Sequence, residues 1–337
     1  MKWPAIILST CAVAGLLWWL FTFRVATSVV VYVSHDQVFS EPILKDFERA
    51  TKIKVNAVYD TEETKSAGVM NRLIAERDNP QADVYWANEP IRAEVLKQKG
   101  ISAPYHSPSA EGIARAFVDP DGHWTGFSAR ARMLIVNRRM TMKPQSIMAY
   151  TDRRFAKQAV MANPLFGTTT TQVAALFALW GDARAENFMS ATRANGVQIA
   201  SSNGESADLV ASGKFQFSMV DSDDVASRLK QGLDIEGVFP DQEAGGLGCF
   251  VVPNAVVLIK NAHNVANGKR LIDYLLSRDT EKKLAYSDAA QIPLHSGVDT
   301  PATVPRLETL KVMTVSYADV AAKLQLIQPF LKTWVGQ

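Results

Sequence analysis

The sequence predicts an α/β protein with two lobes and an apolar segment at its N-terminus. The chain has 337 residues, of which 47% are hydrophobic and 21% charged, so it has a globular composition and is long enough for two lobes. Short β-branched runs alternate with amphipathic stretches, which favours strands joined by helices and a mostly parallel sheet covered on both faces. Lys and Arg number 36 against 34 Asp and Glu, leaving a formal charge of +2, so nucleic-acid binding is not expected.

The N-terminal run from Trp3 to Phe23 contains no charged side chain. As a helix it would extend about 31 Å, enough to cross the hydrocarbon core of a bilayer. The run ends on aromatic residues and Arg24 instead of the small residues of a cleavage site, so we expect residues 1–26 to be an uncleaved membrane anchor. Lys2 precedes the run, which predicts that the body is tethered to the cytoplasmic membrane on the periplasmic or extracellular face. Cleavage of the segment would make the protein secreted.

The first third of the body predicts three strands that alternate with three helices. A strand begins at Ser28, and in the amphipathic stretch that follows Ser40 is the expected N-cap, with Pro42 in the first turn. The next predicted elements are a strand over 53–59, a helix over 63–76, a buried strand over 82–86 and a helix over 89–100 that a glycine ends.

The rest of the chain predicts a second α/β unit. The expected strands are 131–137, 158–163, 197–200, 215–221 and a long run over 245–262. The expected helices are 169–180, 183–194, 263–278, 280–286 and 304–333. No stretch resembles a flexible linker, so the two lobes are not expected to be independent domains joined by a flexible connection.

Sequence motifs for nucleotide and hydrolytic chemistry are absent. The chain has no P-loop, and the GGLG stretch at 245–248 lacks the last glycine of a dinucleotide fingerprint. It also lacks G-x-S-x-G and H-E-x-x-H, and its five histidines are scattered without metal-ligand spacing. Cys249 is the one cysteine after the apolar run, so no disulfide within the body is expected. These absences disfavour an enzyme, although a catalytic site can be assembled from distant residues.

Long stretches of the chain resemble ferric-type periplasmic solute-binding proteins of ABC importers. They are VVVYVSHDQVFSEPILKDFERATKIKVNAVYDTEETKSAGVMNRLIAERDNPQADVYWANEP at 29–90, WTGFSARARMLIVN at 124–137, and the runs at 161–179, 209–224 and 254–285. The resemblance implies a two-lobed periplasmic-binding-protein fold of the second type, with a ligand in the cleft and closure by a hinge. It also implies an ABC permease and ATPase as partners.

The two lobes are expected to be discontinuous in sequence. We expect residues 27–130 and 252–300 to form lobe 1, and residues 131–251 and 301–337 to form lobe 2. The hinge is expected in the two connecting strands, near 128–132 and 250–254.

The resemblance further implies a ligand site built from both lobes. The ten candidate ligand-binding residues are Ser34, His35, Asn88, Glu89, Arg130, Gly167, Thr168, Thr169, Asp223 and Asp224. Arg130 suits an anion, and a glycine and threonines at a helix start offer backbone N–H groups and hydroxyls to one. The candidate metal ligands are His35, Glu89, Asp223 and Asp224. Each position also has an ordinary explanation, such as a solvated loop, a salt bridge or a helix start.

Asp223 and Asp224 stand where ferric binders of this family usually present a pair of tyrosines, so the tyrosine type of ferric site is not expected. The family implies a metal ion of iron transport held with a synergistic anion, phosphate or carbonate, and no other cofactor is expected. The acidic and the anion-binding halves also fit an organic solute with an amine and an anionic group, such as an aminophosphonate. A rival of another class is an enzyme on the same fold that uses Asp223 and Asp224.

Overall fold

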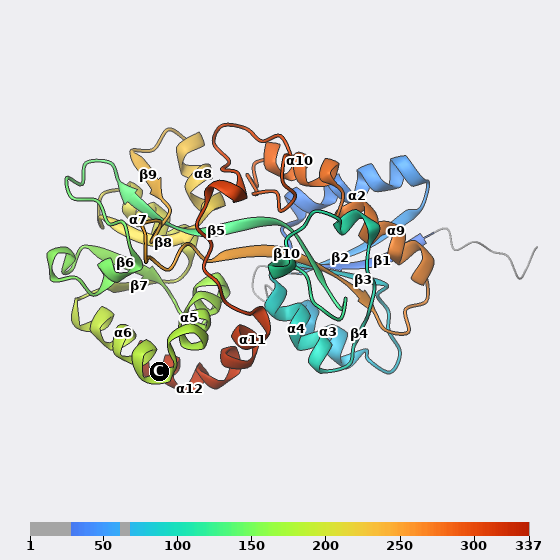
Figure 1. Ribbon diagram of the computed structural model, residues 1–337, viewed down its shortest axis with the longest axis horizontal. Helices are drawn as coiled ribbons and strands as arrows, with labels where there is room; N and C mark the ends of the chain where they lie inside the picture. The colour runs from blue at the N-terminus through green and yellow to red at the C-terminus, as the bar shows by residue number, and fades with distance from the viewer. Residues whose placement is uncertain (1–27, 61–67, 337) are drawn as a thin grey trace, which may run out of the picture.

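Two α/β lobes are joined by two long strands that run side by side through the middle of the molecule (Figure 1). The computed structural model describes residues 28–60 and 68–336. The connecting strands are β5 (Thr125–Asn137) and β10 (Val251–Ile259), which pair antiparallel. The strands of the described residues form one sheet in the order β2-β1-β3-β10-β5-β8-β6-β7, with β4 beside β10 and β9 beside β5. Because β5 and β10 belong to both halves of this sheet, they set the relative position of the lobes.

The first lobe is built on β1 (Ser28–Val33), which lies between β2 (Lys54–Tyr59) and β3 (Val84–Ala87) and is parallel to both. β3 and the short β4 (Ser102–Ala103) pair antiparallel with β10. All residues of β3 are buried, as expected of a strand covered on both faces.

The second lobe has a similar arrangement of parallel strands on the other side of β5 and β10, the two crossing strands. β6 (Ala159–Ala162) is parallel to β7 (Gln198–Ala200) and to β8 (Phe217–Asp221). β8 and β9 (Ile235–Val238) pair antiparallel with β5. The predicted parallel pairing therefore holds within each lobe, whereas the pairings of the two connecting strands are antiparallel.

Helices flank the sheet of each lobe (Figure 1). They are α2 (Gln37–Thr51), α3 (Gly68–Ala75), α4 (Pro90–Gln98), α5 (Gly167–Trp180), α6 (Asp182–Ala194), α7 (Asn203–Ala211), α8 (Ser222–Lys230), α9 (Val265–Leu275), α10 (Arg278–Tyr286), α11 (Tyr317–Leu326) and α12 (Gln328–Val335). Short 3₁₀ turns lie at Pro108–Ala110, Arg115–Phe117, Ile147–Tyr150, Arg153–Phe155 and Leu307–Thr309. The largest buried apolar cluster extends through both lobes, so they share one core through the crossing strands.

Several predicted helix boundaries were wrong. α2 begins at Gln37 instead of after Ser40, because Ser40 is fully buried in register with Ile43, Leu44 and Phe47 and donates its hydroxyl back to the Asp36 carbonyl at 2.9 Å. α5 begins at Gly167, two residues earlier than predicted.

Other predicted elements were wrong in extent. The region predicted as helix over 304–333 is helical only from Tyr317 onward, apart from one 3₁₀ turn. Residues 245–250 of the predicted long strand form a turn that leads into β10. α7 was not predicted, because its glycine and serine near the start hide the helical pattern.

The C-terminal segment ties the two lobes together at the crossing. α11 packs against α5 of the second lobe and α4 of the first. The Tyr317 hydroxyl at its start donates to the Val251 carbonyl of β10 at 2.7 Å. α12 is anchored by the Trp334 indole, which donates to the Met189 carbonyl of α6 at 2.7 Å. This segment therefore stabilises the arrangement of the lobes around β10.

The predicted membrane anchor (residues 1–26, with the apolar run 3–23) and the first residues of the helix predicted over 63–76 lie outside the described residues. Within residues 28–60 and 68–336, every helix is too short or too polar to traverse a bilayer.

Gly248 should be essential for the loop where the C-terminal segment joins β10. Gly248 has φ +80°, and a Cβ there would lie 2.6 Å from the Lys311 carbonyl oxygen. Gly248→Ala should therefore lower the free energy of unfolding by about 2–5 kcal/mol, measured by chemical denaturation. Gly245→Ala is the control. Gly245 also has a positive φ, of +83°, but no atom of the described residues lies within 4 Å of the position that its Cβ would take. This variant should therefore lose only about 1–2 kcal/mol of the free energy of unfolding. Equal losses in the two variants would show that the close approach to Lys311 has no energetic role.

Candidate functional site

A cavity of about 420 Å³ lies between the two lobes at the carboxyl ends of five strands. β1 and β3 end there in the first lobe, and β6, β7 and β8 end there in the second. The lining residues are Ser34, His35, Asp36, Asn88, Arg130, Ala162, Asn163, Phe166, Gly167, Thr168, Thr169, Ser201, Ser202, Asn203, Gly204, Asp221, Asp223 and Asp224. The carboxyl ends of strands in open α/β sheets are where such folds hold their ligands.

Three helices of the second lobe begin at the cavity wall. α5 begins at Gly167, α7 at Asn203 and α8 at Ser222. The first N–H groups of a helix have no partner within the helix and carry its positive dipole end, so two or three such starts around one cavity favour an anion. The Ser202 hydroxyl is used to cap α7, where it accepts from the Glu205 N–H at 3.1 Å. The backbone of α5 and α7 therefore provides the anion-binding part of the wall.

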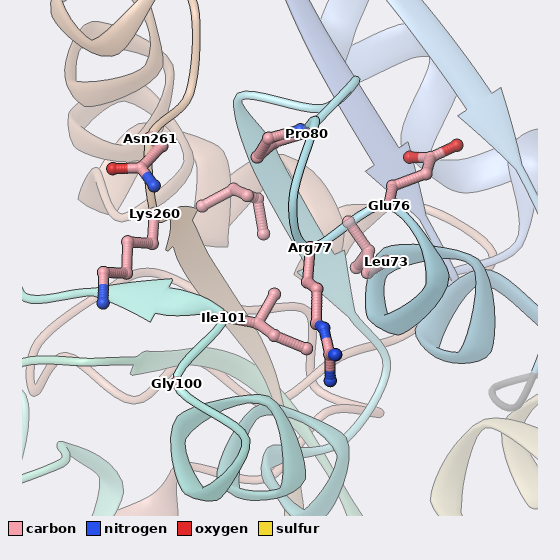
Figure 2. A pocket seen from close by; sticks show the side chains of 9 residues that line it. Leu73, Glu76, Arg77, Pro80, Gly100, Ile101, Lys260 and Asn261 are labelled. Carbon is pink, nitrogen blue, oxygen red and sulfur yellow. The ribbon is translucent and has the colours of Figure 1, made fainter.

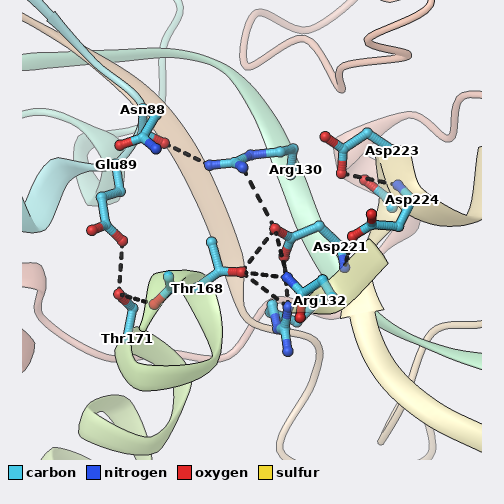
Figure 3. Close-up of polar contacts among 12 residues, drawn as sticks. Asn88, Glu89, Arg130, Arg132, Thr168, Thr171, Asp221, Asp223 and Asp224 are labelled. Carbon is cyan, nitrogen blue, oxygen red and sulfur yellow. Dashed lines mark hydrogen bonds and ion pairs between the residues drawn. The ribbon is translucent and has the colours of Figure 1, made fainter. Parts of the chain in front are cut away.

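A buried ion pair joins Asp221, which lines the cavity, to Arg132 behind it (Figure 3). Arg132 is fully buried on β5, and its Nη1 donates to Asp221 Oδ1 at 2.8 Å and to the Thr168 hydroxyl at 3.0 Å. Thr168 donates in turn to Asp221 Oδ2 at 2.8 Å. Burial alone would raise the pKa of Asp221, but the guanidinium groups of Arg132 and Arg130 outweigh it and hold that pKa below its usual value. Asp221 is therefore a permanent anion whose charge is already neutralised.

Arg130 connects the two lobes above this pair. Its Nη2 donates to the Asn88 carbonyl at the end of β3 at 2.7 Å, and its Nη1 lies 3.5 Å from Asp221 Oδ2 (Figure 3). The side chain is 12% exposed and lines the cavity, so it keeps contact with whatever fills the cavity. Arg130 can therefore form its ion pair with Asp221 and still contact a ligand in the cavity.

Asp223 and Asp224 stand in the first turn of α8, beside Asp221. The Asp224 carboxylate accepts the Asp221 N–H at 3.2 Å, completing a capping box at the helix start. Burial raises the pKa of Asp223 to about 6, with Arg130 opposing the shift and Asp221 adding to it. Burial and the carboxylates of Asp223 and Asp221 raise the pKa of Asp224 to about 8. The pair therefore binds protons more tightly than free carboxylates do, because the protein compensates its negative charge only in part, and a cation in the cavity would take the place of a proton.

His35 forms part of the opposite wall. Its ring stacks on Trp86 with a centroid separation of 5.5 Å and an interplanar angle of 21°. Its Nε2 lies 3.3 Å from Nε2 of Gln291. The ring is 7% exposed, which disagrees with the alternative explanation of a solvated loop histidine.

Glu89 does not line the cavity, unlike the nine other candidate ligand-binding residues. It is buried, its Oε2 accepts from the Thr171 hydroxyl of α5 at 2.7 Å, and its Oε1 accepts from Arg92 Nε at 3.1 Å (Figure 3). Both carboxylate oxygens are thus engaged in holding the start of α4 against α5. The geometry gives Glu89 a role in fixing the lobes and none in contacting a ligand.

The four candidate metal ligands do not form one cluster. Among the described residues, the group of three carboxylates or imidazoles close enough to share an ion is Asp221, Asp223 and Asp224, whose ligand oxygens lie within 4.8 Å of one another. All eight tyrosines of the chain lie in the described residues, and none lines the cavity. The departure from a tyrosine pair is therefore not compensated by a phenol from elsewhere in the chain.

Sequence reasoning missed several lining residues of the second lobe. The main ones are Asn163 after β6, the Ser201–Gly204 turn after β7, and Asp221. The buried Arg132, which pairs with Asp221 without lining the cavity, was also missed. Asn203 donates to the Thr168 hydroxyl at 3.0 Å and accepts from Thr169 at 3.1 Å, so it fixes the start of α5. Their positions in the sequence could have indicated them, because each polar turn follows a strand whose end lies at this edge of the sheet.

A second hollow in the first lobe is too small for a solute. It lies between α3, the turn after α4 and the turn after β10, and Leu73, Arg77 and Lys260 are among the residues that line it (Figure 2). Its volume of about 20 Å³ is close to that of one water molecule. Of these two hollows, the cavity between the lobes is therefore the better candidate for a ligand site.

Comparisons with known proteins agree with this architecture. Residues 82–321 match the model of a family described as bacterial extracellular solute-binding protein. Iron uptake protein A1 of Synechocystis sp. is 26% identical over 288 residues, 80% of this chain and 78% of that protein. A periplasmic protein of Salmonella typhimurium assigned to 2-aminoethylphosphonate binding is 23% identical over 287 residues, 82% of each chain.

Solved structures confirm the expected two-lobed α/β fold. The apo ferric ion-binding protein A of Pasteurella haemolytica superposes with a TM-score of 0.81 at 20% identity, covering 92% of this chain and 98% of that one. At this identity the likeness concerns the fold and not the ligand. The resemblance inferred from the sequence is confirmed at the level of the family.

Replacing Asp224 by asparagine should stabilise the unliganded protein in a pH-dependent way. The folded protein retains a proton on Asp224 up to a pKa of about 8, whereas an unfolded chain releases it near pH 4, so the wild type loses stability as the pH rises between these values. Asp224→Asn keeps an oxygen for the Asp221 N–H but removes the charge. Its melting temperature should exceed that of the wild type at pH 8 and equal it at pH 4.

The exposed Asp78 provides the control for this measurement by differential scanning calorimetry. Asp78→Asn should change the melting temperature equally at both pH values. An increase in the melting temperature of Asp224→Asn that is the same at both pH values would contradict the raised pKa of this carboxyl group.

Proposed function

This chain belongs to the family of bacterial extracellular solute-binding proteins, and we propose that it captures a small ligand in the cavity between its lobes for an ABC importer. The permease and the ATPase of the importer are separate chains, and the protein works on the outer side of the cytoplasmic membrane. It binds its ligand and releases it unchanged, so no catalytic residue is assigned. Asp223 and Asp224 act as ligand-binding groups in this proposal and not as an acid–base pair.

The ligand carries a cationic group and an anionic group, and the observation that supports this is the charge arrangement of the cavity. The starts of α5 and α7, with Thr168 and Thr169, receive the anionic group. Asp223 and Asp224, whose negative charge is only partly compensated, receive the cationic group. A cavity of about 420 Å³ suits a compact solute.

An amine is a better cationic group for this site than a metal ion. Asp221 is already paired with Arg132 and with Thr168, which leaves two carboxylates instead of three for the ligand. Glu89 is engaged outside the cavity lining. A hard cation takes about six or more oxygen ligands, whereas an ammonium group is satisfied by two or three acceptors. The first choice is therefore an amine joined to a phosphonate, phosphate or carboxylate, of which 2-aminoethylphosphonate is the model compound.

A metal ion held with phosphate or carbonate is the second candidate. It is favoured by the three clustered carboxylates and by the iron-uptake description of one relative. In this case Asp223 and Asp224 would supply ligand oxygens, with His35 on the opposite wall, and the anion at the α5 start would complete the coordination.

Closure of the lobes around the ligand would take place at the crossing strands. Residues 128–132 of β5 and 250–254 of β10 form the proposed hinge, with 27–130 and 252–300 in one lobe and 131–251 and 301–337 in the other. Ligand contacts with both lobes, through Arg130 and His35 on one side and Asp223 on the other, would offset the free energy needed to shift the population toward the closed state.

Thermal unfolding of the purified protein tests the choice of ligand. 2-Aminoethylphosphonate at 100 times its dissociation constant should stabilise the fold by about 2.7 kcal/mol and raise the melting temperature. Ethylphosphonate, which lacks the amine, and ferric, manganous and calcium ions, each with and without phosphate, are compared with it. A rise with a metal ion and none with the aminophosphonate would replace the first candidate by the second, and no rise with any probe would contradict both.

Variants of the acidic pair separate charge recognition from general stability. Asp223→Asn/Asp224→Asn should weaken binding of 2-aminoethylphosphonate at least a hundredfold, because the ammonium loses both anionic partners, while ethylphosphonate binding should not weaken. The wild-type affinity for the aminophosphonate should also fall as the pH drops from 8 to 5, since protonation neutralises the pair. The control is Asp78→Asn/Asp279→Asn, two exposed aspartates outside the cavity lining, which should leave affinity unchanged.

A further inference from the structure

A chain of buried hydrogen bonds connects the cavity wall to the crossing strands. Asn254 of β10 donates from Nδ2 to the Ser128 carbonyl of β5 at 2.5 Å and to Gln291 Oε1 at 2.8 Å. Gln291 Nε2 then lies 3.3 Å from Nε2 of His35, which lines the cavity. Asn254, Gln291 and Ser128 are each at most 1% exposed, so water does not compete for these bonds.

The donors and acceptors of this chain have one consistent assignment. The Trp86 indole can only donate, and it lies 3.3 Å from Asn254 Oδ1, so the amide nitrogen of Asn254 must face Gln291 Oε1. The amide nitrogen of Gln291 therefore faces His35, and His35 Nε2 must accept with its lone pair. This arrangement places the proton of His35 on Nδ1 and engages Nε2 with Gln291.

His35 reaches Asn254 by a second route. Its ring stacks on Trp86, whose indole N–H donates to the same Asn254 side chain. A movement of the His35 ring would therefore disturb Asn254 through both Gln291 and Trp86.

The far end of the chain is an irregular point in both crossing strands. Ser128 has φ +39°, which is rare for a residue with a side chain, and its buried hydroxyl has no hydrogen-bond partner among residues 28–60 and 68–336. The register of β10 against β5 shifts at the same level, between Pro253 and Asn254. Strain of this kind is kept where the surrounding contacts hold it, and here Asn254 holds the carbonyl of Ser128.

Glu281 holds the amide of the same residue from the other side. Its buried carboxylate accepts the Ser128 N–H at 2.8 Å and the N–H groups of Leu294 at 2.9 Å and of His295 at 3.0 Å. Ile292, next to Gln291, exchanges two backbone hydrogen bonds of 2.7 Å with Ala129. The backbone at Ser128 is thus held by two sets of hydrogen bonds, one from Glu281 and one from Asn254. The second set continues through Gln291 to His35 in the cavity wall.

We propose that Gln291 and Asn254 are positioning residues that couple the His35 ring in the cavity to the bend of the crossing strands at Ser128. Contact of a ligand with the His35 wall shifts the ring, and the amide chain transmits this shift to the point where the lobes turn. The proposal rests on the proposed function, because it assigns a trigger to closure. Neither amide lines the cavity, so both act through His35.

Amide hydrogen exchange of the unliganded protein tests the coupling without any ligand. His35→Phe keeps a ring on Trp86 but removes the acceptor for Gln291, and it should increase exchange at the amides of Ser128, Ala129 and Ile292 at least threefold. Gln291→Met and Asn254→Leu should do the same. The control Asn195→Leu removes a buried asparagine that donates to the Tyr150 and Asp152 carbonyls in the second lobe, and it should leave those three amides unchanged.

Small-angle X-ray scattering then measures closure with 2-aminoethylphosphonate as the probe. The wild type and Asn195→Leu should become more compact with the probe, whereas Gln291→Met should bind it and remain extended. Unchanged exchange in His35→Phe, or normal closure in Gln291→Met, would overturn the coupling and leave the proposed function intact. A wild type that neither binds nor closes would overturn the choice of ligand, and the exchange result alone would then decide the coupling.

Discussion

The ion pair between Arg132 and Asp221 determines what the cavity can bind. Because Arg132 is fully buried and bonds to Asp221, Thr168 and Gln172, it fixes the start of α5 and neutralises the first of three clustered carboxylates. The charges of Asp223 and Asp224 are compensated only in part, by Arg130 for Asp223 and by Arg228, 3.6 Å away, for Asp224, and burial raises the pKa of both. The cavity therefore combines helix starts that favour an anion with a carboxylate pair that favours a cation.

This division also explains why the scaffold can differ in ligand from relatives of the same fold. The strand ends and helix starts that build the anion-binding wall come from backbone, so they are preserved wherever the fold is preserved. In the proposed function the cationic half depends on two side chains at the start of α8, so we expect that exchanging them changes the preferred cation without changing the fold. Function is thus decided by a few residues on a common frame.

Much of the fold could be predicted from the sequence, since the β-branched run at 28–33, the short apolar run at 84–87 and the helix α4, which Gly100 follows, obey local rules. The start of α2 could not, because burial of Ser40 overrode a capping pattern. Nine of ten candidate site residues line the cavity: eight of them follow a strand end or begin a helix at one edge of the sheet, and Arg130 reaches it from the crossing strand β5. Glu89 shares that position but points to Thr171, and the partners of Arg132 depend on contacts distant in sequence.

Proton release on ligand binding tests most directly whether the acidic pair receives a cationic group. Calorimetric titration with 2-aminoethylphosphonate at pH 7.5, in two buffers of different ionisation enthalpy, counts the protons. With the pKa of Asp224 at about 8, binding should release more than about half a proton per site, and Asp224→Asn should abolish most of this release. Binding without proton release, or equal release by wild type and variant, would contradict an ammonium group at Asp223 and Asp224.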